Sequence, residues 1–338
     1  MKRLTKGMIF LLLVLFMVAC SKEEPKEVQE EPVEVDQPPE KEVYVNSYPL
    51  TGLEKDDEAE YRAFGVMIEN SHAARPQSGL YQADLVYEVL SEATITRLLA
   101  FFHSEKPEII GPVRSARDYY IHLNNGYKGI YVSAGGSPQA IAMFDEKKVD
   151  FISGLKYDGR FFSRSSARKA PHNMYTSYED LLKATENEKY SLEAEVPTLP
   201  FLEADIVLDG EKALQVSINY GSDANNVIYE YDLDQKKYIR IVGEEQSVDL
   251  ETENPVLIDN IFIVEMSHEI LDKQGRRAID ISSGGDGFLI QNGVYQAVQW
   301  KNVDGQILPF KNDQSLGFLR GKTWINVVPE LNSKVSIQ

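Results

Sequence analysis

A chain of 338 residues with 43% hydrophobic residues can form two domains with cores of their own, which excludes a disordered tail or a coiled coil. Its formal net charge of −18 at pH 7 argues against a nucleic-acid partner. The single cysteine, Cys20, excludes an intramolecular disulfide and a cysteine-ligated metal site.

Residues 1–19 have the pattern of an export signal. Three cations, Lys2, Arg3 and Lys6, precede an apolar run over residues 8–19 that is too short to span a bilayer. The sequence M-V-A-C that ends at Cys20 is similar to a lipobox, with methionine where leucine is usual. We therefore expect Cys20 to be the acylated first residue of an extracytoplasmic protein that is anchored to the membrane by lipid. The alternative is a plain signal peptide followed by a free cysteine.

Residues 20–60 are expected to form an acidic, disordered tether. Residues 21–60 contain 14 aspartates and glutamates against four lysines, and they include Pro25, Pro32, Pro38 and Pro39. Like charges and prolines keep a chain extended, and too few apolar residues are present to form a core. The remaining residues, 61–338, have a net charge of −11.

The pattern of residues 61–196 predicts an α/β sandwich with a mixed sheet. Runs rich in β-branched and aromatic residues predict strands over residues 63–69, 83–90, 95–103, 109–113 and 129–134. Helices are expected over residues 118–124, from residue 138 onwards and over 177–187. In such sheets ligands bind at the carboxyl ends of the strands.

The first strand-to-helix turn contains Arg114 and Arg117. Ser115 and Asp118 have the spacing of a capping box, which predicts a helix start with two guanidinium groups beside it. Guanidinium groups donate paired hydrogen bonds to phosphate or carboxylate oxygens, so both arginines and Asp118 are candidate ligand-binding residues. The alternative is that the arginines pair with neighbouring carboxylates.

The second turn has the sequence Gly135-Gly136-Ser137-Pro138. Ser137 is expected to be the N-cap and Pro138 the first helical residue. Two glycines allow a ligand to approach the backbone, and a helix N-terminus has unpaired N–H groups and about half a positive charge. An anion would fit this turn, although the same residues also begin helices that bind nothing.

Residues 160–173 form a second basic run, which is unusual in so acidic a domain. Arg164, Arg168 and His172 belong to it, and the R-S-S-A-R of residues 164–168 resembles the R-S-A-R of residues 114–117. Arg75 and Arg97 complete the predicted ligand-binding set. The alternative is a solvated basic loop that balances acidic neighbours.

From residue 197 onwards, short alternating segments separated by turns predict a mainly antiparallel β domain over residues 197–338. The expected fold class of the whole chain is therefore α+β or α/β. Strands are expected over residues 204–208, 214–220, 227–232, 238–242, 255–264, 278–282, 287–291, 294–300 and 324–328. The glycine-rich stretch 284–287 is either a ligand loop or, as we prefer, a hairpin connection. Trp300 and Trp324 are expected in the core.

Residue patterns typical of metal or hydrolase chemistry are not found. The five histidines include no H-E-x-x-H motif and no closely spaced pair, so no zinc site is expected. Ser137 is followed by proline where a nucleophile elbow needs a free N–H, which argues against a serine hydrolase. We expect no metal and no cofactor, and the sequence identifies no catalytic residue.

Seven longer motifs are distinctive: H-A-A-R-P-Q-S-G-L (72–80), A-D-L-V-Y-E-V-L (83–90), I-T-R-L-L-A (95–100), G-P-V-R-S-A-R (111–117), A-G-G-S-P-Q-A (134–140), A-P-H-N (170–173) and G-K-T-W-I (321–325). Together they resemble the YerB family of uncharacterised bacterial lipoproteins. The resemblance covers nearly the whole mature chain. It implies a lipid-anchored protein with two family domains and no established activity.

The N-terminal part has a second resemblance. Arg97 in one strand, R-D-Y-Y at residues 117–120 after the next and Gly135-Gly136 after a third are similar to the LytR–CpsA–Psr phosphotransferases, which attach polyprenyl-linked glycopolymers to the cell wall. Those enzymes have R-[ST]-D at the first position, whereas residues 97–99 are R-L-L. The resemblance therefore implies an anion pocket and gives no support to magnesium binding or catalysis.

Three functions are consistent with these patterns. The first is a surface lipoprotein that binds a phosphorylated or otherwise anionic envelope ligand, such as a cell-wall polymer or a lipid phosphate. The second is a non-catalytic factor that binds cell-wall assembly proteins, and the third is a phosphoglycan transferase. Arginines that converge on one site favour the first and third functions, and arginines in separate ion pairs favour the second.

Overall fold

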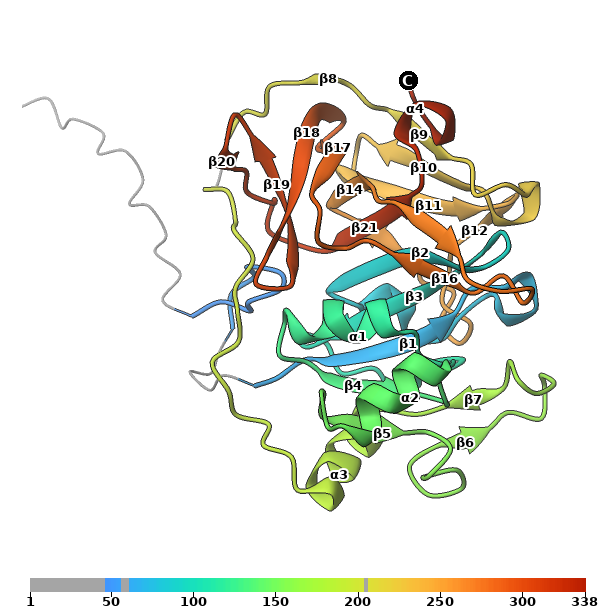
Figure 1. Ribbon diagram of the computed structural model, residues 1–338. Coiled ribbons are helices and arrows are strands. Elements are labelled where there is room, and N and C mark those ends of the chain that lie inside the picture. Colours follow the sequence, from blue (N-terminus) through green and yellow to red (C-terminus); the bar gives the residue numbers. More distant parts are fainter. Residues whose placement is uncertain (1–45, 56–60, 204–205) are drawn as a thin grey trace, which may run out of the picture. The chain divides into compact units, whose positions relative to one another are not determined.

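The described part of the chain, residues 46–55, 61–203 and 206–338 of a computed structural model, is organised around one large mixed β-sheet (Figure 1). Its strands lie in the order β20-β19-β18-β17-β14-β21-β2-β3-β1-β4-β5, and β8 pairs with β18. The strands are β1 Phe64–Glu69, β2 Leu85–Glu92, β3 Ile95–Phe102, β4 Ile130–Ser133, β5 Phe151–Ser153, β8 Glu211–Lys212, β14 Asn260–Glu265, β17 Gly285–Gln291, β18 Val294–Val303, β19 Gln306–Lys311, β20 Gln314–Ser315 and β21 Thr323–Val328.

A smaller sheet packs on one face of the large sheet through a shared hydrophobic core. Its strands are β9 Gln215–Ile218, β10 Val227–Asp232, β11 Lys237–Val242, β12 Glu245–Gln246, β13 Leu257–Ile258 and β22 Val335–Ile337. The remaining strands form two short hairpins, β6 Ser163–Arg164 with β7 Met174–Tyr175 and β15 His268–Ile270 with β16 Arg277–Ile279. Single 3-10 turns cover His72–Ala74, Leu80–Gln82 and Asp223–Asn225.

Helices cover both faces of the large sheet at the end formed by β1 to β5. Side chains of successive strand residues point to opposite faces, so Val66 of β1 joins one core cluster and Met67 joins the other. Helix α3 (Tyr178–Glu188) packs on the first cluster, whereas α1 (Asp118–Asn125) and α2 (Pro138–Asp145) pack on the second. The last helix is α4, Leu331–Lys334. The predicted α+β class with a mixed sheet is therefore confirmed.

The two predicted helix starts differ in their capping. Ser137 is the N-cap of α2, as predicted, and its hydroxyl accepts a backbone hydrogen bond. Helix α1 begins at Asp118, but its N-cap is Arg117 and no side chain caps it. The capping-box prediction is wrong because the Ser115 hydroxyl instead donates to the carbonyl of Ala134 at 3.0 Å.

The strands largely follow the expected segments, with two corrections. Residues 109–113 do not form a regular strand but make single bridges to Ile68, Ser78 and Thr176. Pro112 interrupts this stretch because it has no N–H to donate to a ladder. The strand expected over residues 204–208 is not present in the described residues 206–208. Both tryptophans are buried, as predicted.

The two halves of the sequence share the large sheet. Strand β21 from residues 197–338 lies between β2 and β14 and runs parallel to both. Residues 46–55, which were expected in the tether, also pack on this part of the chain: Leu50 is fully buried and the carbonyl of Pro49 accepts from the N–H of Leu199. The tether prediction is corrected for residues 46–55, and its residues 20–45 and 56–60 lie outside the described chain. The sequence predicts that residues 61–196 and 197–338 fold separately, whereas the strand that they share predicts that they fold together.

Candidate functional site

The predicted site lies at one edge of the large sheet, where three parallel strands end. Strands β1 and β4 are parallel, and β2 has the same direction because both β1 and β2 pair antiparallel with β3. Near the start of β3, Arg97 is the register partner of Glu69, the last residue of β1. The carboxyl ends of β1, β2 and β4 therefore meet the beginning of β3, as expected for a ligand site in such a sheet.

Backbone hydrogen bonds join the two predicted turns at this edge. The N–H of Ala116 donates to the carbonyl of Gly135 at 2.9 Å, and the N–H of Ser137 donates to the carbonyl of Ala116 at 3.1 Å. The N–H of Ala134 donates to the carbonyl of Arg114 at 2.9 Å. Gly135 has φ +78°, a conformation that favours glycine. The structure thus places Gly135, Gly136 and Ser137 beside the turn that contains both arginines.

Two of the arginines bind the same carboxylate, Glu92 at the end of β2. Arg97 donates from Nη2 to Glu92 Oε2 and Oε1 at 2.9 and 3.0 Å, and from Nη1 to the carbonyl of Ser115 at 3.0 Å. Arg117 donates from Nη2 to Glu92 Oε1 and from Nη1 to the carbonyl of Ala116 at 2.7 Å. The arginine side chains are only 4% and 8% exposed, whereas Glu92 is 26% exposed. The carboxylate is therefore partly exposed, whereas the two guanidinium groups that bind it are nearly buried.

The third arginine, Arg114, pairs with Glu69. Its side chain is 20% exposed, and the Glu69 side chain is 3% exposed. His172 Nδ1 lies 3.6 Å from Glu69 Oε2, so this residue of the second basic run reaches the same carboxylate. Burial lowers the pKa of Arg114; the negative charge of Glu69 opposes this shift and the positive charge of Arg97 adds to it. The charges of Arg97 and Arg114 are thus close enough to affect one another.

A layer of tyrosines lies beneath Arg97 and Arg117. The hydroxyl of Tyr120 donates to the carbonyls of Arg97 and Val89 at 2.7 and 3.0 Å. Burial raises the pKa of Tyr119 to about 12 and that of Tyr131 well above its usual range. The Tyr131 hydroxyl is buried and has no hydrogen-bond partner among the described residues. Charges beside such a buried layer, which excludes water, interact more strongly than they would in water.

Arg75 and Arg168 of the predicted set bind protein carbonyls elsewhere. Arg168 donates to the carbonyls of Ala74 and Pro76 at 2.7 and 2.6 Å. Arg75 donates to the carbonyl of Ala224 at 2.7 Å. The guanidinium N–H groups of both arginines are thus bonded to backbone carbonyls, and neither arginine belongs to the site around Glu92 and Glu69.

Arg164 and Asp118 also differ from the pattern expected of ligand-binding residues. Arg164 pairs with Asp158 at 2.7 Å and lines a separate hollow of about 460 Å³. Asp118 is half-buried at the start of α1. The remaining residues, Arg97, Arg114, Arg117, Glu69 and Glu92, form what we call the arginine site.

Sequence reasoning left open whether neighbouring carboxylates pair with these arginines and did not identify Glu69 as the partner of Arg114. Glu92 is five residues before Arg97, across a β-hairpin turn, and this spacing was a usable signal for their contact. Glu69 and Arg114 belong to different segments, so no local pattern indicated their pairing. Within the described residues, no three histidines, aspartates or glutamates form a group that could hold a metal ion. The helices in these residues also include none that is long and apolar enough to cross a membrane.

Comparison with known proteins identifies the family to which this fold belongs. The N-terminal domain of the family described as "Protein of unknown function (DUF3048)" matches residues 50–191, and the C-terminal domain of that family matches residues 216–325. The chain belongs to this family.

Among its relatives is YerB of Bacillus subtilis strain 168, a candidate lipoprotein by its name. It is 44% identical over 288 residues, which cover 84% of this chain and 87% of YerB. The crystal structure of B. subtilis YerB has a TM-score of 0.81 to this structure and covers 87% of this chain and 99% of that one. The predicted YerB resemblance is confirmed. The similarity to the LytR–CpsA–Psr enzymes stays a prediction.

Proposed function

We propose that this protein is an extracytoplasmic, lipid-anchored protein that binds a phosphorylated ligand of the cell envelope at the arginine site. The anchor is supported by the lipoprotein name of YerB and by the lipobox-like sequence before Cys20, which lies outside the described residues. The ligand-binding part is supported by the geometry around Glu92.

That geometry is the observation on which the proposal depends. Two nearly buried guanidinium groups from different segments of the chain bind one partly exposed carboxylate. A phosphate has the same kind of oxygen acceptors as a carboxylate and accepts the same paired bonds from arginine. Glu92 is therefore an intramolecular competitor for an anionic ligand, and the site has three arginines against two glutamates.

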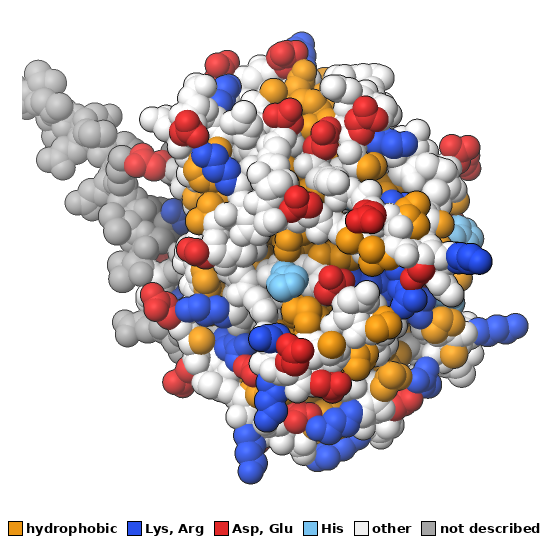
Figure 2. All heavy atoms as spheres, viewed as in Figure 1, with side chains coloured by type: hydrophobic (Ala, Val, Ile, Leu, Met, Phe, Trp, Pro, Cys, Tyr) orange, Lys and Arg blue, Asp and Glu red, His pale blue; other side chains and the backbone are white. Residues whose placement is uncertain are grey.

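Long-range attraction cannot bring an anion to this protein. Residues 61–338 have a net charge of −11, and acidic and basic side chains are interspersed over the face shown in Figure 2. Salt screens charges separated by more than about 8–10 Å. Binding of an anion must therefore depend on a local group of arginines that is partly shielded from water.

Substitution Cys20→Ala is expected to abolish acylation and to release the protein from the membrane, because the thiol is the only site for the lipid. Metabolic labelling with a fatty-acid analogue and membrane fractionation measure both effects. Unchanged labelling of the variant would refute acylation of Cys20, whereas ligand binding at the arginine site is tested separately.

Substitution Glu92→Ala is expected to lower Tm by several degrees, because two nearly buried arginines lose their carboxylate at a cost of about 2–3 kcal/mol. Millimolar pyrophosphate should restore Tm, since an anion can take the place of the lost carboxylate. It should stabilise Glu92→Ala more than the wild type, in which Glu92 competes. The double variant with Arg117→Ala should lose this rescue. Differential scanning fluorimetry measures all three.

Asp150→Ala is the matched control. Asp150 pairs with the 12%-exposed Arg62 at 2.5 Å, just before β1, whereas Glu69 is the last residue of that strand. The two ends of β1, and with them the two ion pairs, are about 20 Å apart. Pyrophosphate should not rescue this variant, because one isolated arginine is not an anion site. If pyrophosphate has equal effects on both variants, or none, then Arg97, Arg114 and Arg117 are structural and the protein-binding alternative is favoured.

A further inference from the structure

A groove on the face of β17 and β18 is separate from the arginine site. A hollow of about 470 Å³ lies between α4 and the turn after β19, and a second of about 430 Å³ adjoins the turn before β17. Asp286 and Gln299 line both hollows, so the two adjoin along the strands. The glycine-rich stretch 284–287, which the sequence suggested as a hairpin connection, instead includes the first residues of β17.

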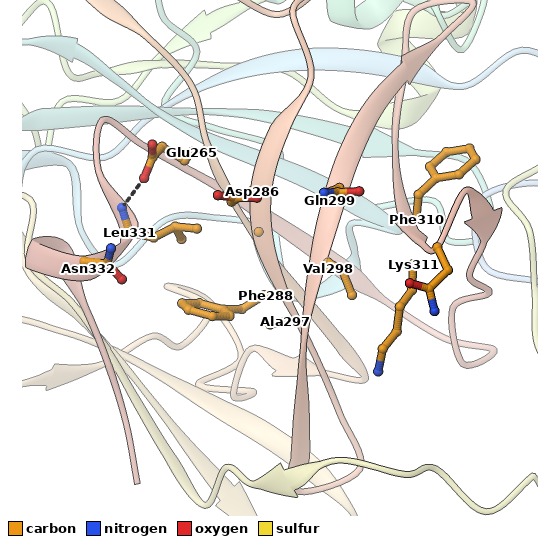
Figure 3. A pocket seen from close by; sticks show the side chains of 12 residues that line it. Glu265, Asp286, Phe288, Ala297, Val298, Gln299, Phe310, Lys311, Leu331 and Asn332 are labelled. Atoms are coloured by element: carbon orange, nitrogen blue, oxygen red, sulfur yellow. Dashed lines mark hydrogen bonds between the residues drawn. The ribbon is translucent and has the colours of Figure 1, made fainter.

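The middle of the groove consists of two rows of side chains. Asp286 and Gln299 are register partners on neighbouring strands, and Phe288 and Ala297 form the next row (Figure 3). Ala297 is small, so the ring of Phe288 borders an open space. That ring is held edge-on by Tyr295, with centroids 5.6 Å apart at 90°. The groove therefore has a fixed aromatic side beside a polar row.

The polar side chains of this groove have unused hydrogen-bonding capacity. Asp286 and Gln299 are exposed, and within the described chain neither side chain has a hydrogen-bond partner. Asn332 of α4, at the far side of the groove, is in the same situation. Glu265 accepts a bond from the N–H of Leu331 at 2.7 Å through one of its two oxygens. The groove thus offers a carboxylate that only accepts and two amides that both donate and accept.

The charges that line the groove balance. Glu265 and Asp286 contribute two negative charges, and Lys311 and Lys301 contribute two positive ones. Both lysines are already engaged, Lys311 with Gln296 at 3.0 Å and Lys301 with Asp313 at 2.8 Å. An anionic ligand would therefore find no free positive charge in this groove.

We propose that this groove binds a neutral polysaccharide chain. Hydroxyl groups donate to a carboxylate and both donate to and accept from amides, and the apolar face of a sugar ring packs against an aromatic ring such as Phe288. A neutral chain matches the balanced charge, and two adjoining hollows suit several linked units. An added peptide strand would need a free sheet edge. The backbones of β17 and β18 are instead paired on both sides, with β14 and β19.

Calorimetric titration of the full mature chain with cellohexaose, chitohexaose and maltohexaose tests this proposal. At least one of these neutral hexasaccharides should give saturable binding. Asp286→Ala should weaken that binding at least about tenfold and Gln299→Ala about threefold to tenfold, because each loses bonds to hydroxyl groups. Neither side chain supports the fold through a hydrogen bond, so both variants should keep the wild-type Tm.

Three variants serve as controls and should bind within about twofold of the wild type. Gln274→Ala removes an exposed amide in the turn between β15 and β16, away from the residues that line the groove. Asp304→Ala removes an exposed carboxylate at the turn after β18. Arg114→Ala alters the arginine site only, so the two sites are tested independently. Absence of binding by all three sugars at millimolar concentration, or equal weakening by Gln274→Ala, would overturn the groove.

Discussion

Substitution Arg240→Ala is expected to lower the free energy of unfolding by about 3–5 kcal/mol, because it leaves Glu88 charged and unpaired in the core. Both side chains are fully buried, and Arg240 Nη2 lies 2.9 and 2.8 Å from the two carboxylate oxygens of Glu88. Glu88 also accepts from Trp324 Nε1 at 3.0 Å and from Thr96 Oγ1 at 2.9 Å. This pair connects β2 of the large sheet with β11 of the small one.

Urea unfolding of the variant and the wild type measures this difference. Arg276→Ala is the control, because Arg276 pairs with Asp272 at 2.5 Å in a partly exposed position where an ion pair contributes about 0–1 kcal/mol. The double variant Arg240→Met/Glu88→Gln should recover part of the loss, since it removes both buried charges. A cost below about 1 kcal/mol for Arg240→Ala would show that the two sheets do not depend on this pair.

A fragment of residues 197–338 is expected to remain unfolded when it is expressed alone. Its strand β21 has β2 as one neighbour, with register pairs from Leu85 with Thr323 to Val89 with Val327. Without β2, a central and fully buried strand would expose one edge and much of its apolar surface to water. Circular dichroism and urea unfolding test this expectation.

The complementary experiment is co-expression of residues 197–338 with residues 20–196, which supplies β2 and should restore a cooperative transition. A cooperative transition of the isolated fragment would instead support the domain boundary that the sequence predicts at residue 197. The change of pattern at that residue and the separate family matches over residues 50–191 and 216–325 mark an organisation of the sequence. This organisation does not require that each region folds alone, because β21 of the second region pairs with β2 of the first.

Elements that depend on local interactions could be predicted from the sequence. Runs of β-branched residues predicted β1 and β3 nearly to the residue, and serines at helix starts predicted the caps of α2 and α3. The alternation of polar and apolar residues in the second half predicted most of its strands. It could not predict that β21 pairs parallel with both β2 and β14, because alternation specifies the faces of a strand and not its neighbours.

The sequence by itself determined the acidic composition of residues 20–60, the α+β class, the turns with Arg114, Arg117 and Gly135-Gly136, and the family. Only the tertiary structure decided which charges face each other. Glu88 and Arg240 are 152 residues apart. Glu69 and Glu92 bind Arg114 and Arg117, for which the sequence had left both a ligand and a neighbouring carboxylate open as partners. Ion pairing depends on distances of a few ångströms between side chains, and such distances are set by sheet order and register rather than by spacing along the chain.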